Sequence, residues 1–101
     1  MKKLIFISIF SLLYAIEHQP LVKASAALKA GMYKEALRHV TDAQKDAPTN
    51  SDVYRMQGLL HEAIDEPEQA LRAWKRCLKF SKTQEMKNEA NIHIQSLSEG
   101  L

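Results

Sequence analysis

The chain has few of the residues that interrupt or cross-link a fold: among 101 residues there are 3 glycines, 3 prolines and 1 cysteine. A lone cysteine cannot form an internal disulfide, so packing alone must hold the fold together. No segment alternates apolar with polar residues over the length of a strand, and the few prolines and glycines fall between segments of helical periodicity. The sequence therefore predicts an all-α domain.

An excess of either charge is also nearly absent. The chain has 14 basic and 12 acidic residues, and two of the basic residues, Lys2 and Lys3, lie at the N-terminus. Residues 16–101 are therefore formally neutral, with 12 charges of each sign. Proteins hold nucleic acids and anionic membranes through many lysine and arginine contacts, so this balance argues against nucleic acid as a partner.

The first residues have the pattern of a secretory signal peptide. Lys2 and Lys3 precede an uncharged run from Leu4 to Ile16, and Ala15 supplies a small residue next to a cleavage site. The run, of about 13 residues, is shorter than the roughly 20 that cross a bilayer as a helix. We predict a signal peptide over residues 1–15 and export to the periplasm or the extracellular space. In the alternative, residues 1–15 are retained as a membrane anchor and the domain faces the periplasm.

Proline, glycine and capping residues divide the rest of the chain into five expected helices. Pro20 and Pro67 suit a first helical turn, because the N–H that proline lacks would be unpaired there. Gly31 suits the left-handed residue that ends a helix. Thr49, Asn50 or Ser51 can cap the third helix, an acidic residue of Asp65-Glu66 the fourth, and Thr83 the fifth. The expected helices run from Pro20 to Ala30, Met32 to Asp46, Asp52 to Ile64, Pro67 to Lys82 and Gln84 to Ser98.

One order of small and large residues occurs twice in the chain, at a shift of 34 positions. This period is typical of a stacked helix-turn-helix unit, whose usual work is to hold other proteins. The shift places Ala24 on Gly58, Ala36 on Ala70, Leu37 on Leu71, Val40 on Trp74 and Ala43 on Cys77.

These positions resemble the tetratricopeptide repeat family. Tyr54, Gly58, Ala70 and Trp74 hold the family's aromatic, small, small and large apolar places in the second unit, and Pro48 closes the first. The resemblance implies a right-handed helical-hairpin solenoid of two units, 17–50 and 51–84, followed by a capping helix over 85–98. Such stacks usually need about three units. We therefore expect contact with a partner, or self-association, to complete the core.

In this family the first helix of each unit faces a concave, peptide-binding groove. The resemblance implies that Arg55 forks onto a carboxylate or carbonyl of the ligand, while leucines cover its apolar side chains. A second interpretation stays open: with two units, these side chains face solvent or contact the capping helix. The six positions, called the groove residues below, are Leu21, Ser25 and Leu28 in the first helix and Arg55, Leu59 and Glu62 in the third.

The fourth expected helix carries five basic residues on the face opposite Leu71, Trp74 and Leu78. They are interpreted either as a solvated face whose positive charge lies toward the negative end of the helix dipole, or as a docking surface for an acidic partner. This basic stripe consists of Arg72, Lys75, Arg76, Lys79 and Lys82.

The sequence shows no arrangement that predicts catalysis or metal binding. No two of the histidines, at 18, 39, 61 and 93, are three or four positions apart, so none pair on one helical face. Cys77 occupies a packing position of the repeat, which favours a buried thiol over a reactive one. We expect no metal, no cofactor and no enzyme activity; an enzyme using Cys77 or His61 is the weakest alternative.

The leading hypothesis is a non-enzymatic interaction module: an exported adaptor or scaffold, or an accessory subunit of a cell-envelope complex, that binds a peptide or helix of a protein partner. The alternative is a membrane-anchored structural subunit of a larger complex, in which the N-terminal hydrophobic segment is kept. The sequence names neither the partner nor the pathway.

Overall fold

The computed structural model describes residues 19–101, and these form helices with no strand among them. The prediction of an all-α domain is confirmed for this part of the chain. The predicted signal peptide, residues 1–15, lies outside the described residues. The helices are α2 (Pro20–Lys29), α3 (Tyr33–Asp46), α4 (Ser51–Ala63), α5 (Pro67–Phe80) and α6 (Gln84–Gly100).

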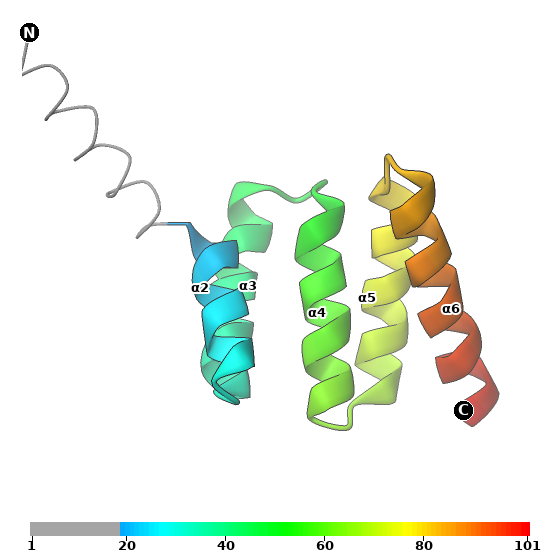
Figure 1. Ribbon diagram of the computed structural model, residues 1–101, viewed down its shortest axis with the longest axis horizontal. Helices are drawn as coiled ribbons and strands as arrows, with labels where there is room; N and C mark the ends of the chain where they lie inside the picture. Colours follow the sequence, from blue (N-terminus) through cyan, green and yellow to red (C-terminus); the bar gives the residue numbers. More distant parts are fainter. Residues whose placement is uncertain (1–18) are drawn as a thin grey trace, which may run out of the picture.

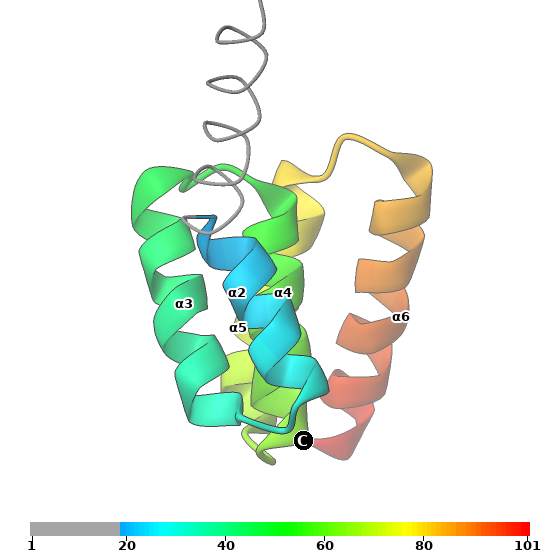
Figure 2. The ribbon, with the colours of Figure 1, turned by 60° about the vertical axis from the view of Figure 1, so that its left-hand side comes forward.

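Successive helices run antiparallel and each packs against the next one along the chain (Figure 1). Contacts also skip a helix: α2 packs against α4, and side chains of α4 contact α6. The view of Figure 2 places α3 and α6 on opposite sides of the ribbon, with α2 between them in front. Short connections make this order necessary, because only neighbours in sequence can close such tight helical hairpins.

The helix ends lie within two residues of their predicted positions, and the caps explain why. Gly31 takes the left-handed conformation that its position required, with φ of 74°. The Asn50 side chain accepts a hydrogen bond from the Asp52 N–H, and the Thr83 hydroxyl accepts one from the Met86 N–H. The largest differences are of two residues: α6 continues to Gly100, and α5 stops at Phe80, because Ser81 is already extended and its hydroxyl donates to the Thr83 carbonyl.

The predicted acidic cap of α5 is wrong. Glu66 occupies the cap position but makes no capping hydrogen bond; its carboxylate lies 3.0 Å from Nδ1 of His61 instead. Asp65 does not cap either, because it takes the left-handed conformation, with φ of 59°. Asp65 therefore does in the second hairpin what Gly31 does in the first.

The turns of the two hairpins have the same pattern of backbone hydrogen bonds, just as the two hairpins have the same sequence pattern. In the first, Gly31 N–H donates to the Leu28 carbonyl at 3.0 Å and Met32 N–H to the Ala27 carbonyl at 2.8 Å. In the second, Asp65 N–H donates to Glu62 at 3.1 Å and Glu66 N–H to His61 at 2.8 Å. These four bonds satisfy helix-end carbonyls that would otherwise be unpaired. The backbone conformation of the turn therefore repeats after 34 positions, as the sequence pattern does.

The core consists of two clusters of buried residues, one for each hairpin. Small residues dominate it, which lets paired helices approach closely. Of the positions that repeat in sequence, all are buried in both hairpins except Leu37 and Leu71, which are partly buried. The first cluster contains Ala24, Ala27, Ala36, Val40 and Leu60, and the second contains Tyr54, Ala70, Trp74, Cys77 and Ala90.

Trp74 of α5 lies against Gly58 of α4 so closely that no side chain fits between them. A Cβ atom at position 58 would come within 2.6 Å of Cε2 and Nε1 of the indole. In the first hairpin Ala24 and Val40 occupy the equivalent places, and both are fully buried. Glycine thus faces the large tryptophan in one hairpin, and alanine faces the smaller valine in the other. This compensation in size keeps the packing dense in both hairpins.

We predict that Gly58→Ala destabilises the fold, although alanine favours a helix by about 1 kcal/mol over glycine. The new methyl group must displace a fully buried indole ring, and overpacking of this kind costs about 1–3 kcal/mol. The ring would also lose the contacts that hold it on its other sides, so the expected net loss is about 2 kcal/mol. Urea unfolding measures it.

The matched control is Gly100→Ala, at the end of α6, where nothing lies within 4 Å of an added Cβ. Its stability should equal that of the parent or exceed it by a few tenths of a kcal/mol. Equal stability of the Gly58→Ala and Gly100→Ala variants would contradict the close contact between α4 and α5.

Candidate functional site

The groove residues on α2 are half-buried. Leu21 and Leu28 pack on the first core cluster, and Ser25 lies between them on the same helix. Leu21 also lines a mostly apolar hollow of about 170 Å³ at the start of α2, together with Ala43 of α3 and Val53 of α4. The α2 part of the predicted groove therefore offers apolar surface around one hydroxyl group.

The groove residues on α4 contact α6. Arg55 Nε donates to both carboxylate oxygens of Glu89, at 2.8 and 3.0 Å. This hydrogen bond, more than any other influence, raises the pKa of the Arg55 guanidinium. Leu59 packs on the second core cluster. Of the two interpretations, contact with the last helix therefore describes Arg55, which is already paired inside the chain.

Glu62 is the centre of a partly buried polar contact between three helices. Its carboxylate accepts a hydrogen bond from the indole N–H of Trp74 at 2.8 Å and lies 2.9 Å from Nδ1 of His93. The imidazole of His93 stacks on the Trp74 indole, with 4.0 Å between ring centroids and 10° between planes. Glu62 therefore ties α4 to both α5 and α6, and its carboxylate is occupied.

The sequence analysis missed Glu89 and His93, the two α6 side chains that cover the α4 part of the groove. A signal for both was present in the 34-position period. Arg55 and Glu89 are 34 positions apart, and the same shift carries Leu59 onto His93. The first helix of a third unit would place these residues on the groove face. Because α6 was predicted as a capping helix outside the repeat, Glu89 and His93 were not predicted to lie opposite the groove residues of α4.

All five side chains of the basic stripe are exposed; four of them lie on α5, and Lys82 lies just beyond its end. Within the described part of the chain, none of them lies within ion-pair distance of a carboxylate. Arg76 lies over the ring of Tyr54, 5.8 Å from its centroid, and Lys79 lies 5.3 Å from the centroid of Phe80. The structure thus brings these five charges together on one surface and leaves them without carboxylate partners among residues 19–101.

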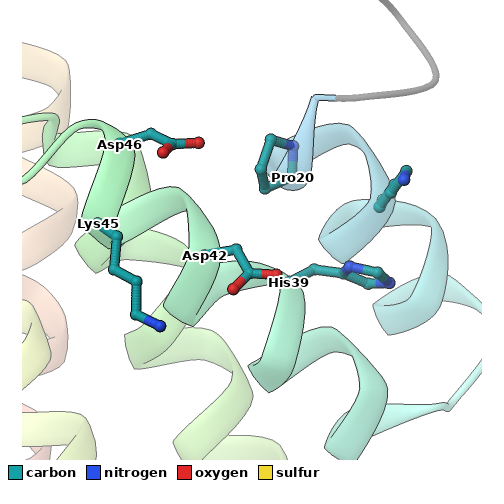
Figure 3. A pocket seen from close by; sticks show the side chains of 6 residues that line it. Pro20, His39, Asp42, Lys45 and Asp46 are labelled. Atoms are coloured by element: carbon teal, nitrogen blue, oxygen red, sulfur yellow. The ribbon is translucent and has the colours of Figure 1, made fainter.

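A hollow of about 340 Å³ lies between the start of α2 and the end of α3, as Figure 3 shows. Pro20 closes it from α2, and Asp42 and Asp46 project from α3. Lys23, His39 and Lys45 complete the lining. Opposite charges alternate around this hollow, so it provides no concentrated field for a charged ligand.

Other classes of site find little support. Among residues 19–101, no three histidine, cysteine, aspartate or glutamate side chains are grouped closely enough to hold a metal ion. No helix in the described part of the chain combines the length and apolar character needed to cross a bilayer.

Cys77 is fully buried in the second core cluster. Burial, and to a smaller degree the charge of Glu89, raises the pKa of its thiol to about 11. The thiolate is the nucleophilic form of cysteine, so at neutral pH this side chain is both inaccessible and unreactive. Packing is the role that its surroundings support.

We predict that Glu62→Ala destabilises the fold by about 1–3 kcal/mol, because it leaves the buried indole N–H of Trp74 without an acceptor. Glu62→Gln keeps a carbonyl oxygen at that place and should lose less than about 1 kcal/mol. Trp74 is the only tryptophan, so its fluorescence reports the site directly during denaturant unfolding. Equal losses in the two variants would contradict the role given to the hydrogen bond.

We also predict that the free energy of unfolding falls as the pH rises from about 9 toward 11. The folded-state pKa of Cys77, about 11, lies above the ordinary 9.0. The unfolded chain therefore loses this proton first, and alkaline pH favours unfolding. The loss should reach about 2–3 kcal/mol above pH 11. Urea titrations at each pH measure it, and the Cys77→Ala variant should lack this component; the same decline in that variant would contradict the assignment.

Comparison with known proteins gives no relative from which a role could be transferred. No protein-family model, no curated protein and no solved structure matches the chain. The residues and geometry described above are therefore the basis for assigning a function.

Proposed function

We propose that residues 16–101 form a right-handed solenoid of the tetratricopeptide type, with two helical-hairpin units and a capping helix, and act as a non-enzymatic protein-binding module. One observation supports this above all others. The hairpin turns after α2 and α4 repeat the same backbone hydrogen bonds, and the same small and large positions are buried at a spacing of 34 residues. Repeats of this kind present extended surfaces whose usual use is to hold other proteins.

The binding surface in this proposal is the α2 end of the groove. Arg55 and Glu62 already have partners within the chain, so a ligand would have to displace them. Among the described residues, no hydrogen bond holds the α2 groove residues Leu21, Ser25 and Leu28 against α6. An apolar face of a peptide or helix from the partner would lie there, because burying apolar surface against leucine side chains is favourable and burying a charge there is not.

Export is part of the proposal and is supported by the sequence of residues 1–15. Two lysines followed by an uncharged apolar run and a small residue are the features that signal peptidase substrates share. The module would then act as an adaptor, scaffold or accessory subunit in the periplasm or cell envelope. A retained N-terminal segment would instead make the chain a membrane-anchored subunit of a larger complex, with the same binding face.

We expect a photoreactive phenylalanine analogue placed at Ser25 to cross-link one partner protein in the organism that makes the chain. Ser25 lies at the centre of the α2 surface and contributes no side chain to either core cluster. Mass spectrometry of the adduct identifies the partner. The same spectra read the N-terminus: a chain that begins at Ile16 supports export, and one that retains residues 1–15 supports the anchored alternative.

The matched control carries the analogue at Ser98, which is exposed near the end of α6. No adduct should form there. Adducts of equal yield at both positions would show random collision, and a folded Ser25 variant that cross-links nothing would contradict binding at this face.

A further inference from the structure

A further hollow, distinct from the two described above, lies between α3, α4 and α5. Its lining differs in chemistry from the groove residues. It has a volume of about 220 Å³. No groove residue and no carboxylate is part of its lining, although the Glu66 carboxylate contacts the lining residue His61. The lining consists of Gln44 of α3, Gln57 and His61 of α4, and Gln69, Arg72, Ala73 and Arg76 of α5.

The hydrogen bonds inside this lining leave donors directed outward. Gln57 donates through Nε2 to the amide oxygen of Gln44 at 2.6 Å, which leaves the Gln44 amide nitrogen as a donor for a ligand. His61 is held from behind by Glu66, through Nδ1 at 3.0 Å. With Nδ1–H donating to Glu66, Nε2 of the neutral ring is an acceptor, so the donors for a carboxylate come from the Gln44 amide and the arginines and not from His61.

Two guanidinium groups supply the positive charge. Arg72 and Arg76 are one helical turn apart on α5, so their side chains lie next to each other. Each carries five N–H donors in a planar fork, which matches the two oxygens of a carboxylate. Neither has a carboxylate within 4.0 Å among the described residues. Lys75 and Lys79 continue the positive surface along the same helix, and Lys82 follows just after its end.

We propose that this hollow and the basic stripe bind an acidic segment of a partner protein, with one aspartate or glutamate carboxylate held between Arg72 and Arg76. Charge complementarity identifies the occupant: the surface is rich in donors, positive and without acidic neighbours in its lining. The helical part of the stripe, from Arg72 to Lys79, is only about 10 Å long. That length suits a short peptide, whereas nucleic acid is held through a larger array of phosphate contacts.

The site is separate from the groove, so it stands whether or not the proposed function is correct. Binding at the groove would bury apolar surface and depend little on salt. Binding at the hollow would weaken as salt is added, because the charges concerned are exposed and screened. The two surfaces could hold two parts of one partner, and a linked pair of weak contacts gives tighter binding than either alone.

The test measures binding of a dye-labelled peptide in which glutamate alternates with serine, by fluorescence anisotropy with the full chain at low salt. We expect saturable binding, and no binding of the same peptide with glutamine in place of glutamate. The Arg72→Gln/Arg76→Gln double variant should weaken binding by about 10-fold or more, as loss of charged hydrogen bonds predicts.

Two variants with the same change in charge serve as controls. Lys23→Gln/Lys29→Gln, on α2, should alter affinity by less than about 2-fold. If Lys75→Gln/Lys79→Gln weakens binding as much as the arginine variant, diffuse charge explains the result and the hollow is not a site. Tighter binding of a single-stranded oligonucleotide of equal charge would also overturn the proposal. Unfolding followed by Trp74 fluorescence verifies that each variant is folded.

Discussion

The close contact of Trp74 with Gly58 is the interaction on which the rest of the structure depends. Because position 58 has no side chain, the indole reaches the α4 backbone and is completely buried. The same ring presents its N–H to Glu62 and its face to His93. One side chain of α5 thus fixes the distance to α4 and the position of α6. The first hairpin is held in the same way by the smaller pair Ala24 and Val40, which is why both hairpins keep one geometry.

Helix α6 is attached in two different ways, and the difference bears on function. Apolar side chains such as Ala90 and Ile94 bury it against the second core cluster. Its links to α4, by contrast, are polar: Glu89 with Arg55 and His93 with Glu62. Polar contacts of this kind gain little net free energy but fix the register between helices, because an unpaired partner is costly. They also occupy the α4 residues of the predicted groove, which leaves its α2 end as the surface for a proposed ligand.

The two proposed binding surfaces therefore differ in character. The α2 surface has leucines around a serine and suits an apolar segment. The hollow between α3, α4 and α5 has arginines, amides and an imidazole, and it suits a carboxylate. The formally neutral composition of residues 16–101 conceals this separation, because charge is balanced over these residues as a whole while the basic residues of α5 lie on one side of one helix. Local arrangement, and not net charge, decides what such a protein can hold.

The sequence by itself determined the helical class, the positions of the helices, most of their caps and the small and large residues of the core. These follow from local backbone chemistry and from periodicity, as Gly31 and Thr83 illustrate. The tertiary structure alone decided which charges meet. Nothing in the local pattern distinguishes Arg55, which pairs with Glu89, from Arg76, which has no carboxylate within ion-pair distance among the described residues. That difference depends on where α6 lies, and the position of α6 is set by long-range packing on Trp74 and not by its own sequence pattern.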